Sequence, residues 1–108
     1  MKWIDTEVLA TFIEEAEERL TSVESGLLRL EKNLANRDVD LLRDIFREAH
    51  SLKATSNLLG FQDIETVAHH LENTLEQMRQ GQLEPSEQVI SDLLAHVDSM
   101  RAHVARLK

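Results

Sequence analysis

The chain has 108 residues, which is the usual size of a single domain, and its 20 acidic and 12 basic residues give a formal net charge of −8 at pH 7. A surface of that sign repels a phosphate backbone, so we expect no nucleic-acid binding. No apolar run approaches the roughly 20 residues that cross a bilayer, and Met1–Asp5 turns acidic at once, unlike a signal peptide. There is no Cys, which excludes disulfides and thiolate chemistry. We therefore expect one cytoplasmic domain over residues 1–108, without membrane insertion.

The spacing of apolar residues predicts four amphipathic helices. Only three Gly and one Pro interrupt the chain, which favours helices. Apolar residues recur at the i, i+3, i+4 spacing of a buried helical face in four segments. The predicted helices cover about residues 5–35, 39–59, 62–80 and 85–107.

Residues that begin and end helices lie at the edges of these segments. Asp5 or Thr6 can cap the first helix, and Asp38 or Asp40 the second. Gly60 suits the left-handed position after the second helix.

Two further residues bear on the helix boundaries. Pro85 fits the first turn of the fourth helix, where its missing N–H would have no helical partner. Gly26 costs about 1 kcal/mol relative to Ala inside a helix, but the apolar pattern continues through it, so we expect one long first helix. Trp3 either anchors the N-terminus or contacts a neighbouring domain.

The connectors between the predicted helices are too short to join parallel neighbours. Four amphipathic helices with such connectors pack as an up-and-down bundle. The sequence therefore predicts an all-α fold, an antiparallel four-helix bundle with a long first helix, part of which projects or makes an extra contact.

One face of the second predicted helix carries polar groups around a patch of little bulk. His50 lies one residue away from the apolar stripe, at the edge of the buried face. Lys53 follows one turn later and Asn57 about two turns later on the same side, while Ala54 is small. We expect a partner to approach this face closely, with Ala54 and Asn57 near the centre of its footprint.

The second and third helices form an antiparallel hairpin centred on Phe61. Residues equally far from that centre should lie at the same level, which brings His50 level with Glu72 and Lys53 level with His69. A neutral imidazole whose Nδ1–H is bonded to a carboxylate keeps Nε2 as a free nucleophile. We therefore predict that His50 is a nucleophile, that Glu72 holds its tautomer, that Lys53 supplies electrostatic support and that His69 assists by hydrogen bonding.

These residues carry a resemblance to a known family. His50-Ser51-Leu52-Lys53-Ala54, followed by Gly60-Phe61 and His69-His70-Leu71-Glu72-Asn73, resembles histidine-containing phosphotransfer (HPt) domains. The likeness is closest to the N-terminal phosphotransfer domain of CheA-type chemotaxis histidine kinases. It covers about residues 42–81 in detail and the whole chain in helix layout.

The resemblance implies a carrier of phosphoryl groups in a two-component phosphorelay. His50 would accept the group on Nε2 from a histidine kinase catalytic domain and pass it to an aspartate of a response regulator receiver domain, with Lys53, His69 and Glu72 as hydrogen-bonding neighbours. In the family a Gly usually follows the Lys, where this chain has Ala54. Ser56 and Asn57 replace what is often an Ala-Gly pair, which bears on partner choice.

The chain has no Gly-rich phosphate loop, so we expect no cofactor and expect ATP chemistry to come from a kinase domain of the same full-length protein. A free-standing relay protein is the second possibility. A helical interaction or dimerisation bundle without phosphotransfer is the alternative function. A metal site from His50, His69 and Glu72 is disfavoured because Lys53 would repel a cation, and we predict no metal. A dimerising histidine-kinase helix pair would have an acidic residue after the His, where this chain has Ser51.

Overall fold

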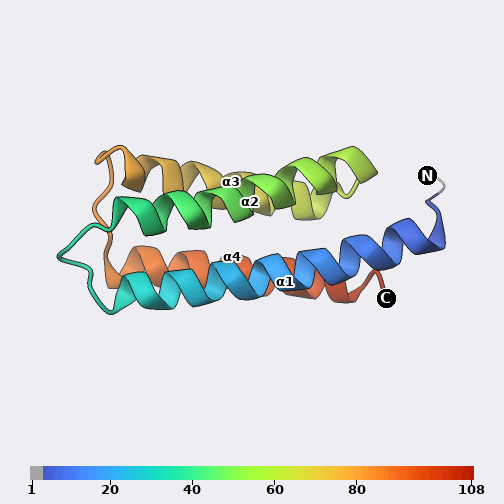
Figure 1. The fold of residues 1–108 in the computed structure, drawn as a ribbon, viewed down its shortest axis with the longest axis horizontal. Coiled ribbons are helices and arrows are strands. Elements are labelled where there is room, and N and C mark those ends of the chain that lie inside the picture. Colours follow the sequence, from blue (N-terminus) through green and yellow to red (C-terminus); the bar gives the residue numbers. More distant parts are fainter. Residues whose placement is uncertain (1–3) are drawn as a thin grey trace.

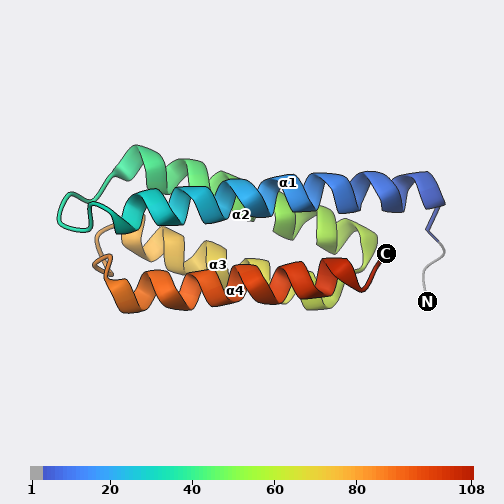
Figure 2. The ribbon, with the colours of Figure 1, turned by 90° about the horizontal axis from the view of Figure 1, so that it is seen from below.

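Four helices run alternately up and down in the computed structural model, which describes residues 4–108 and therefore leaves Trp3 outside (Figure 1). They are α1 (Thr6–Glu31), α2 (Val39–Leu59), α3 (Gln62–Arg79) and α4 (Glu87–Ala105). Helix α1 packs against α2 and α4, and α3 packs against the same two helices, so the four form a closed ring (Figure 2). The bundle measures 46 × 20 × 20 Å. The predicted all-α four-helix bundle is confirmed.

The interior consists of the apolar stripes that the sequence predicts. Each helix contributes side chains with almost no exposed surface, and together they make one continuous core. The largest fully buried side chains are Leu20, Leu27, Leu30, Leu42, Leu52, Ile64, Leu71, Leu75, Met78, Ile90, Leu93 and Met100. Burial of such side chains stabilises by roughly 1.5–3 kcal/mol each, and this term holds the helices together. Within residues 4–108 no helix combines the length and the hydropathy that a membrane crossing requires.

The helix caps agree with the sequence at three ends. Asp5 accepts a hydrogen bond from the backbone N–H of Glu7, and Asp38 accepts one from that of Leu41. Gly60 ends α2 with φ of 82°, a left-handed conformation that Gly adopts without steric cost. These caps satisfy N–H and C=O groups that helix ends leave without intrahelical partners.

Two helix boundaries differ from the prediction. Helix α1 ends at Glu31 and not near residue 35, because the chain turns immediately after Lys32. Helix α4 begins at Glu87 and not at Pro85, because the Ser86 hydroxyl accepts the backbone N–H of Val89 and acts as the N-cap. Pro85 therefore precedes the helix.

Gly26 marks a close approach between α1 and α2. The helix continues through it as predicted, and the residue is buried. A Cβ at this position would lie 2.6 Å from Cγ1 and 2.9 Å from Cδ1 of Ile45, which is closer than van der Waals contact allows. The absence of a side chain at residue 26 therefore sets how near α1 and α2 can lie.

The N-terminal end of α1 extends beyond the turn that joins α2 and α3 (Figures 1 and 2). This is the projection that the long first helix predicts. Helices α2 and α3 are joined only by Gly60 and Phe61, whose N–H groups bond to Asn57 and Ser56 carbonyls. This tight turn fixes the register of the hairpin on which the candidate site lies.

Candidate functional site

His50 lies on the outer surface of α2, next to the core. Its neighbours Ala49 and Leu52 are fully buried, so they fix the rotation of the helix about its axis. The His50 side chain consequently points away from the interior and is 57% exposed. A group on this ring is therefore accessible to another molecule.

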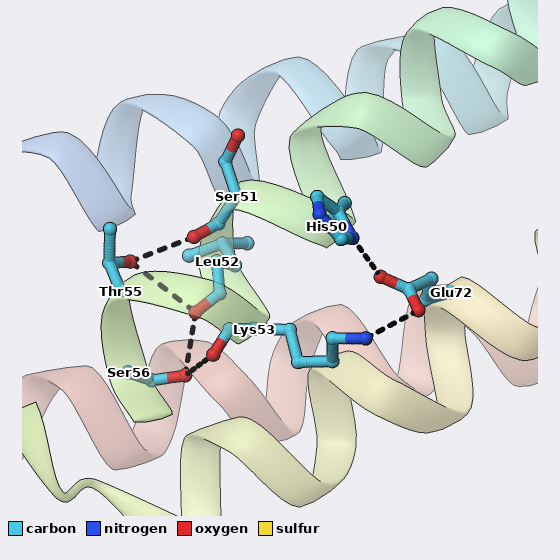
Figure 3. Close-up of polar contacts among 7 residues, drawn as sticks. All are labelled: His50, Ser51, Leu52, Lys53, Thr55, Ser56 and Glu72. Carbon is cyan, nitrogen blue, oxygen red and sulfur yellow. Dashed lines mark hydrogen bonds and ion pairs between the residues drawn. The ribbon is translucent and has the colours of Figure 1, made fainter. Parts of the chain in front are cut away.

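Glu72 lies opposite on α3 and bonds to two side chains of α2. Its Oε2 lies 2.7 Å from His50 Nδ1, and its Oε1 lies 2.7 Å from Lys53 Nζ (Figure 3). The Glu72 side chain is only 10% exposed, and a nearly buried carboxylate needs partners of this kind. The predicted level of His50 with Glu72 is confirmed.

The charge on Glu72 determines which nitrogen of His50 carries a proton. Burial opposes ionisation of the Glu72 carboxyl, but hydrogen bonds from Lys53 and His50 outweigh it and hold its pKa below the usual value. Glu72 is then a carboxylate at neutral pH and accepts a hydrogen bond from Nδ1 only when that nitrogen carries a proton. In the neutral ring this leaves Nε2 with its lone pair free, which is the tautomer of a nucleophile.

The Lys53 ammonium does not lie at the level of its own backbone along α2. It is expected level with His69, but its ammonium bonds to Glu72, since its four-carbon side chain can span a helical turn. The His69 side chain is exposed on α3, and within residues 4–108 no hydrogen bond of its ring is found. The structure therefore brings His50, Lys53 and Glu72 together. His69 lies on the surface of α3, three residues before Glu72.

Ala54 and Asn57 are both exposed on α2, on the C-terminal side of His50. Their predicted part in docking a partner remains a prediction, and the exposure of both residues is compatible with it.

The two hydroxyl residues after Ala54 bond to their own helix. Ser56 is fully buried and its Oγ donates to the Leu52 carbonyl at 2.6 Å, while Thr55 Oγ1 donates to the Ser51 carbonyl at 2.9 Å (Figure 3). A buried hydroxyl without a partner would be costly, and these bonds remove that cost. Ser56 is therefore tolerated in the core nearly two turns after His50.

A second group of aromatic and charged side chains lies beside His50. The ring of Phe46, one turn earlier on α2, is stacked on the His50 ring with centroids 6.0 Å apart and planes 14° apart. The Arg79 guanidinium from α3 lies 5.9 Å from the centre of the Phe46 ring. Sequence reasoning missed this arrangement because Phe46 belongs to the apolar stripe. Its i, i+4 spacing from His50 is the signal that could have found it.

The geometry bears on the metal-site hypothesis. Within residues 4–108, no three side chains of His, Cys, Asp or Glu are placed to hold a metal ion together. Both Glu72 oxygens already bond to His50 and Lys53. The rings of His70 and His96 stack on each other between α3 and α4, with centroids 6.2 Å apart.

The structure is a four-helix bundle in which an exposed His50 on α2 bonds to the carboxylate of Glu72 on α3. The family model of the Hpt domain matches residues 7–103, so the chain belongs to the Hpt domain family. It is a histidine phosphotransfer domain of a two-component system, as the resemblance of its motifs implied.

Two relatives of this chain are chemotaxis proteins. The CheA protein of Halobacterium salinarum is 36% identical over 94 residues, and that of Rhizobium meliloti is 37% identical over 92 residues. These alignments cover 87% and 85% of this chain but only 14% and 12% of the relatives. The chain therefore spans a small part of the length of the curated relatives it matches.

Solved structures agree with the fold. The CheA phosphotransferase domain from Thermotoga maritima superposes with a TM-score of 0.89 at 30% identity, covering 97% of this chain and 98% of that one. A computationally redesigned four-helix bundle gives a TM-score of 0.90 at 19% identity, which supports the fold alone.

Proposed function

We propose that His50 is the residue that carries the phosphoryl group. The observation that supports this most directly is the bond between Glu72 and His50 Nδ1, which leaves Nε2 unprotonated on an exposed ring. The Nε2 lone pair would form the new N–P bond while the bond from phosphorus to the leaving group breaks and its electron pair departs with that group. The proton on Nδ1 stays in the bond to Glu72 and stabilises the charge that the ring acquires.

The neighbouring polar residues have supporting roles in this proposal. Glu72 holds the tautomer and orientation of the His50 ring. The Lys53 ammonium, part of the same ion-pair network, offsets the negative charge of the incoming phosphoryl group. His69, exposed on α3 one turn from Glu72, assists by donating a hydrogen bond to the phosphoryl oxygens.

The donor in this proposal is a histidine kinase catalytic domain, and the acceptor is an aspartate on a receiver domain of a response regulator. Membership of the Hpt family supports both partner classes. The similarity to CheA proteins several times longer supports a kinase domain in the same full-length protein, which would act in the cytoplasm, where ATP is available. A complete gene that encodes little beyond Lys108 would favour a free-standing relay protein instead.

The receiver is proposed to dock across α2 and α3 around His50. Ala54 and Asn57 would lie near the centre of its footprint, because both are exposed on α2 and lie about one and two turns after His50. Small and polar side chains at these positions let the receiver aspartate approach Nε2 in line with the N–P bond that breaks.

Treatment with a small phosphoramidate donor, followed by intact-mass measurement and peptide mapping at alkaline pH, tests the proposal. Wild type should gain one phosphoryl group on His50, labile in acid, and His50→Gln should gain none. His70→Gln is the matched control and should behave as wild type. Adducts spread over His69, His70, His96 and His103 would show that His50 has no special activation, and would favour the interaction-bundle alternative.

A further inference from the structure

The bond to Glu72 fixes the His50 ring at only one atom. An imidazole turns about two side-chain bonds, and a single hydrogen bond at Nδ1 leaves the plane of the ring free to tilt about that bond. With 57% of the side chain exposed, solvent does not restrain this motion. Some other contact must restrain the ring if Nε2 is to keep one direction.

Phe46 provides such a contact on the face of the His50 ring. The two rings are nearly parallel, with an angle of 14° between their planes and 6.0 Å between their centroids, a distance within the range of favourable offset stacking. Because Phe46 is half-buried against the core, its own position is fixed by packing. The stack therefore connects the exposed imidazole to the rigid interior of the bundle.

Phe46 is also held from the side of α3. The Arg79 guanidinium lies 5.9 Å from the centre of the Phe46 ring, as in a cation–π contact. Arg79 is itself fixed by two hydrogen bonds of 2.7 Å, from Nε and Nη2 to the two carboxylate oxygens of Glu76. The chain of contacts runs from Glu76 through Arg79 and Phe46 to His50.

We propose that Phe46 is a positioning residue for phosphotransfer, which fixes the plane of the His50 ring while Glu72 fixes its tautomer, and that Arg79 holds Phe46 in place. This inference rests on the proposed role of His50. Attack on phosphorus requires the Nε2 lone pair to point along the line of the breaking bond, and misalignment of reacting atoms by about 1 Å can lower a rate on the order of a hundredfold. The two supports therefore act on different properties of one ring.

The test compares phosphorylation rates with phosphoramidate, which is too small to depend on protein docking. Its P–N bond breaks as the bond from Nε2 to phosphorus forms, and ammonia leaves after protonation by solvent. We expect Phe46→Ala to lower the rate about tenfold, Arg79→Ala to lower it less, and Phe46→Tyr, which keeps the ring, to restore it. Phe61→Leu and Phe46→Leu form a matched pair, and only the second should slow the reaction.

Nitrogen-15 spectra of the His50 ring separate positioning from a loss of the fold or of the tautomer. Phe46→Ala should keep the Nδ1-protonated form of wild type and the wild-type circular dichroism, although its rate falls. A wild-type rate in Phe46→Ala and Phe46→Leu would overturn the proposal, as would an altered tautomer in Phe46→Ala. If wild type itself gains no phosphoryl group on His50, the proposed function fails. If wild type and the Phe46 variants are phosphorylated at equal rates, only the role of Phe46 fails.

Discussion

Glu72 is the residue on which the polar groups of the site depend. It is the one charged residue among the buried side chains of residues 4–108, and each of its carboxylate oxygens bonds to a different residue of α2. Lys53 and His50 compensate its burial, and they hold its pKa below the usual value despite the opposing effect of desolvation. A single side chain thus bonds both to a ring nitrogen of His50 and to the Lys53 ammonium.

Replacement of Glu72 by Ala should slow phosphorylation of His50 without abolishing it. Nε2 remains exposed, but the ring loses the acceptor that selects the reactive tautomer. We expect a loss of about 10–100-fold, the range seen when the carboxylate behind a metal-bound His is removed. Rates with phosphoramidate, measured alongside circular dichroism, check this expectation. Complete loss in a folded variant would mean that Glu72 takes part in the chemistry more directly.

Glu72 should also contribute a pH-dependent part of the stability. Because its pKa is lowered in the folded state from a usual value of 4.5, its contribution is complete above that value and is lost as the pH falls through the folded pKa. Between about pH 5 and pH 3, urea unfolding should therefore show a larger loss of stability in wild type than in Glu72→Gln. Parallel losses in the two proteins would contradict this expectation.

Ala54→Trp should block transfer to the receiver domain while leaving the helix content intact. Ala54 is exposed on α2, so a large side chain adds bulk to the docking face without disturbing the core. Ala102→Trp, an equally exposed change on α4, is the control and should transfer at the wild-type rate. Equal transfer rates for the two variants would exclude the proposed docking position.

Sequence reasoning could place His50 opposite Glu72. In a tight hairpin whose first helix stops at Gly60, the number of residues between a side chain and the turn gives its level along the helix. It could not place the Lys53 ammonium, since a long side chain does not end at the level of its backbone. It assigned Phe46 to the core from periodicity alone. Spacing cannot show that one side chain packs against the core and also stacks on the His50 ring.

At the scale of the helices, the distance between α1 and α2 depends on Gly26. This residue lowers helix propensity, yet the space that its side chain would need is occupied by Ile45. The helix therefore retains a residue that local preference disfavours, because tertiary packing outweighs propensity.

Gly26→Ala should destabilise the bundle by about 1 kcal/mol, since overpacking costs about 1–3 kcal/mol and the gain in helix propensity returns about 1 kcal/mol. In an Ile45→Ala background the same change should be stabilising, because the obstructing side chain is absent. Urea unfolding of the four proteins gives both values in one double-mutant cycle. The same sign in both backgrounds would show that Ile45 is not the obstacle.

The ends of the helices could be predicted only in part. Gly60 is an unambiguous stop signal and is found as the C-cap of α2, whereas Asp38 and Asp40 both suit the start of that helix, and the chain uses Asp38. Around Pro85 two signals compete, since Pro suits a first helical turn and Ser86 suits an N-cap, and the chain adopts the second. The apolar spacing of α1 continues to Leu34, which lies beyond the end of the helix. Leu34 belongs to a turn, and its half-buried side chain packs against the core from there.

In the molecule as a whole, the His50 ring lies outside the core. Buried side chains form the interior along all four helices, whereas the His50 ring lies outside them and contacts Glu72 and Phe46 at the surface. Chemical change at Nε2 should therefore leave the packing of the bundle unaltered.

Phosphorylation should change the free energy of unfolding by less than about 1 kcal/mol, which corresponds to a few degrees in Tm for a domain of this size. Urea unfolding at 25 °C and alkaline pH, where the N–P bond survives, compares the two forms. His50→Gln carried through the same treatment controls for effects of the donor. A larger difference between the two forms would mean that the phosphoryl group reorganises the helices.

The short connection between α2 and α3 also bears on the order in which the protein folds. His50 and Glu72 are 22 positions apart, and Lys53 and Glu72 are 19 apart. Closing a chain segment of this length costs little entropy, and contacts between near neighbours in sequence form quickly. We therefore expect the contact between His50 and Glu72 to need only the α2–α3 hairpin, and to form before α1 and α4 dock against it.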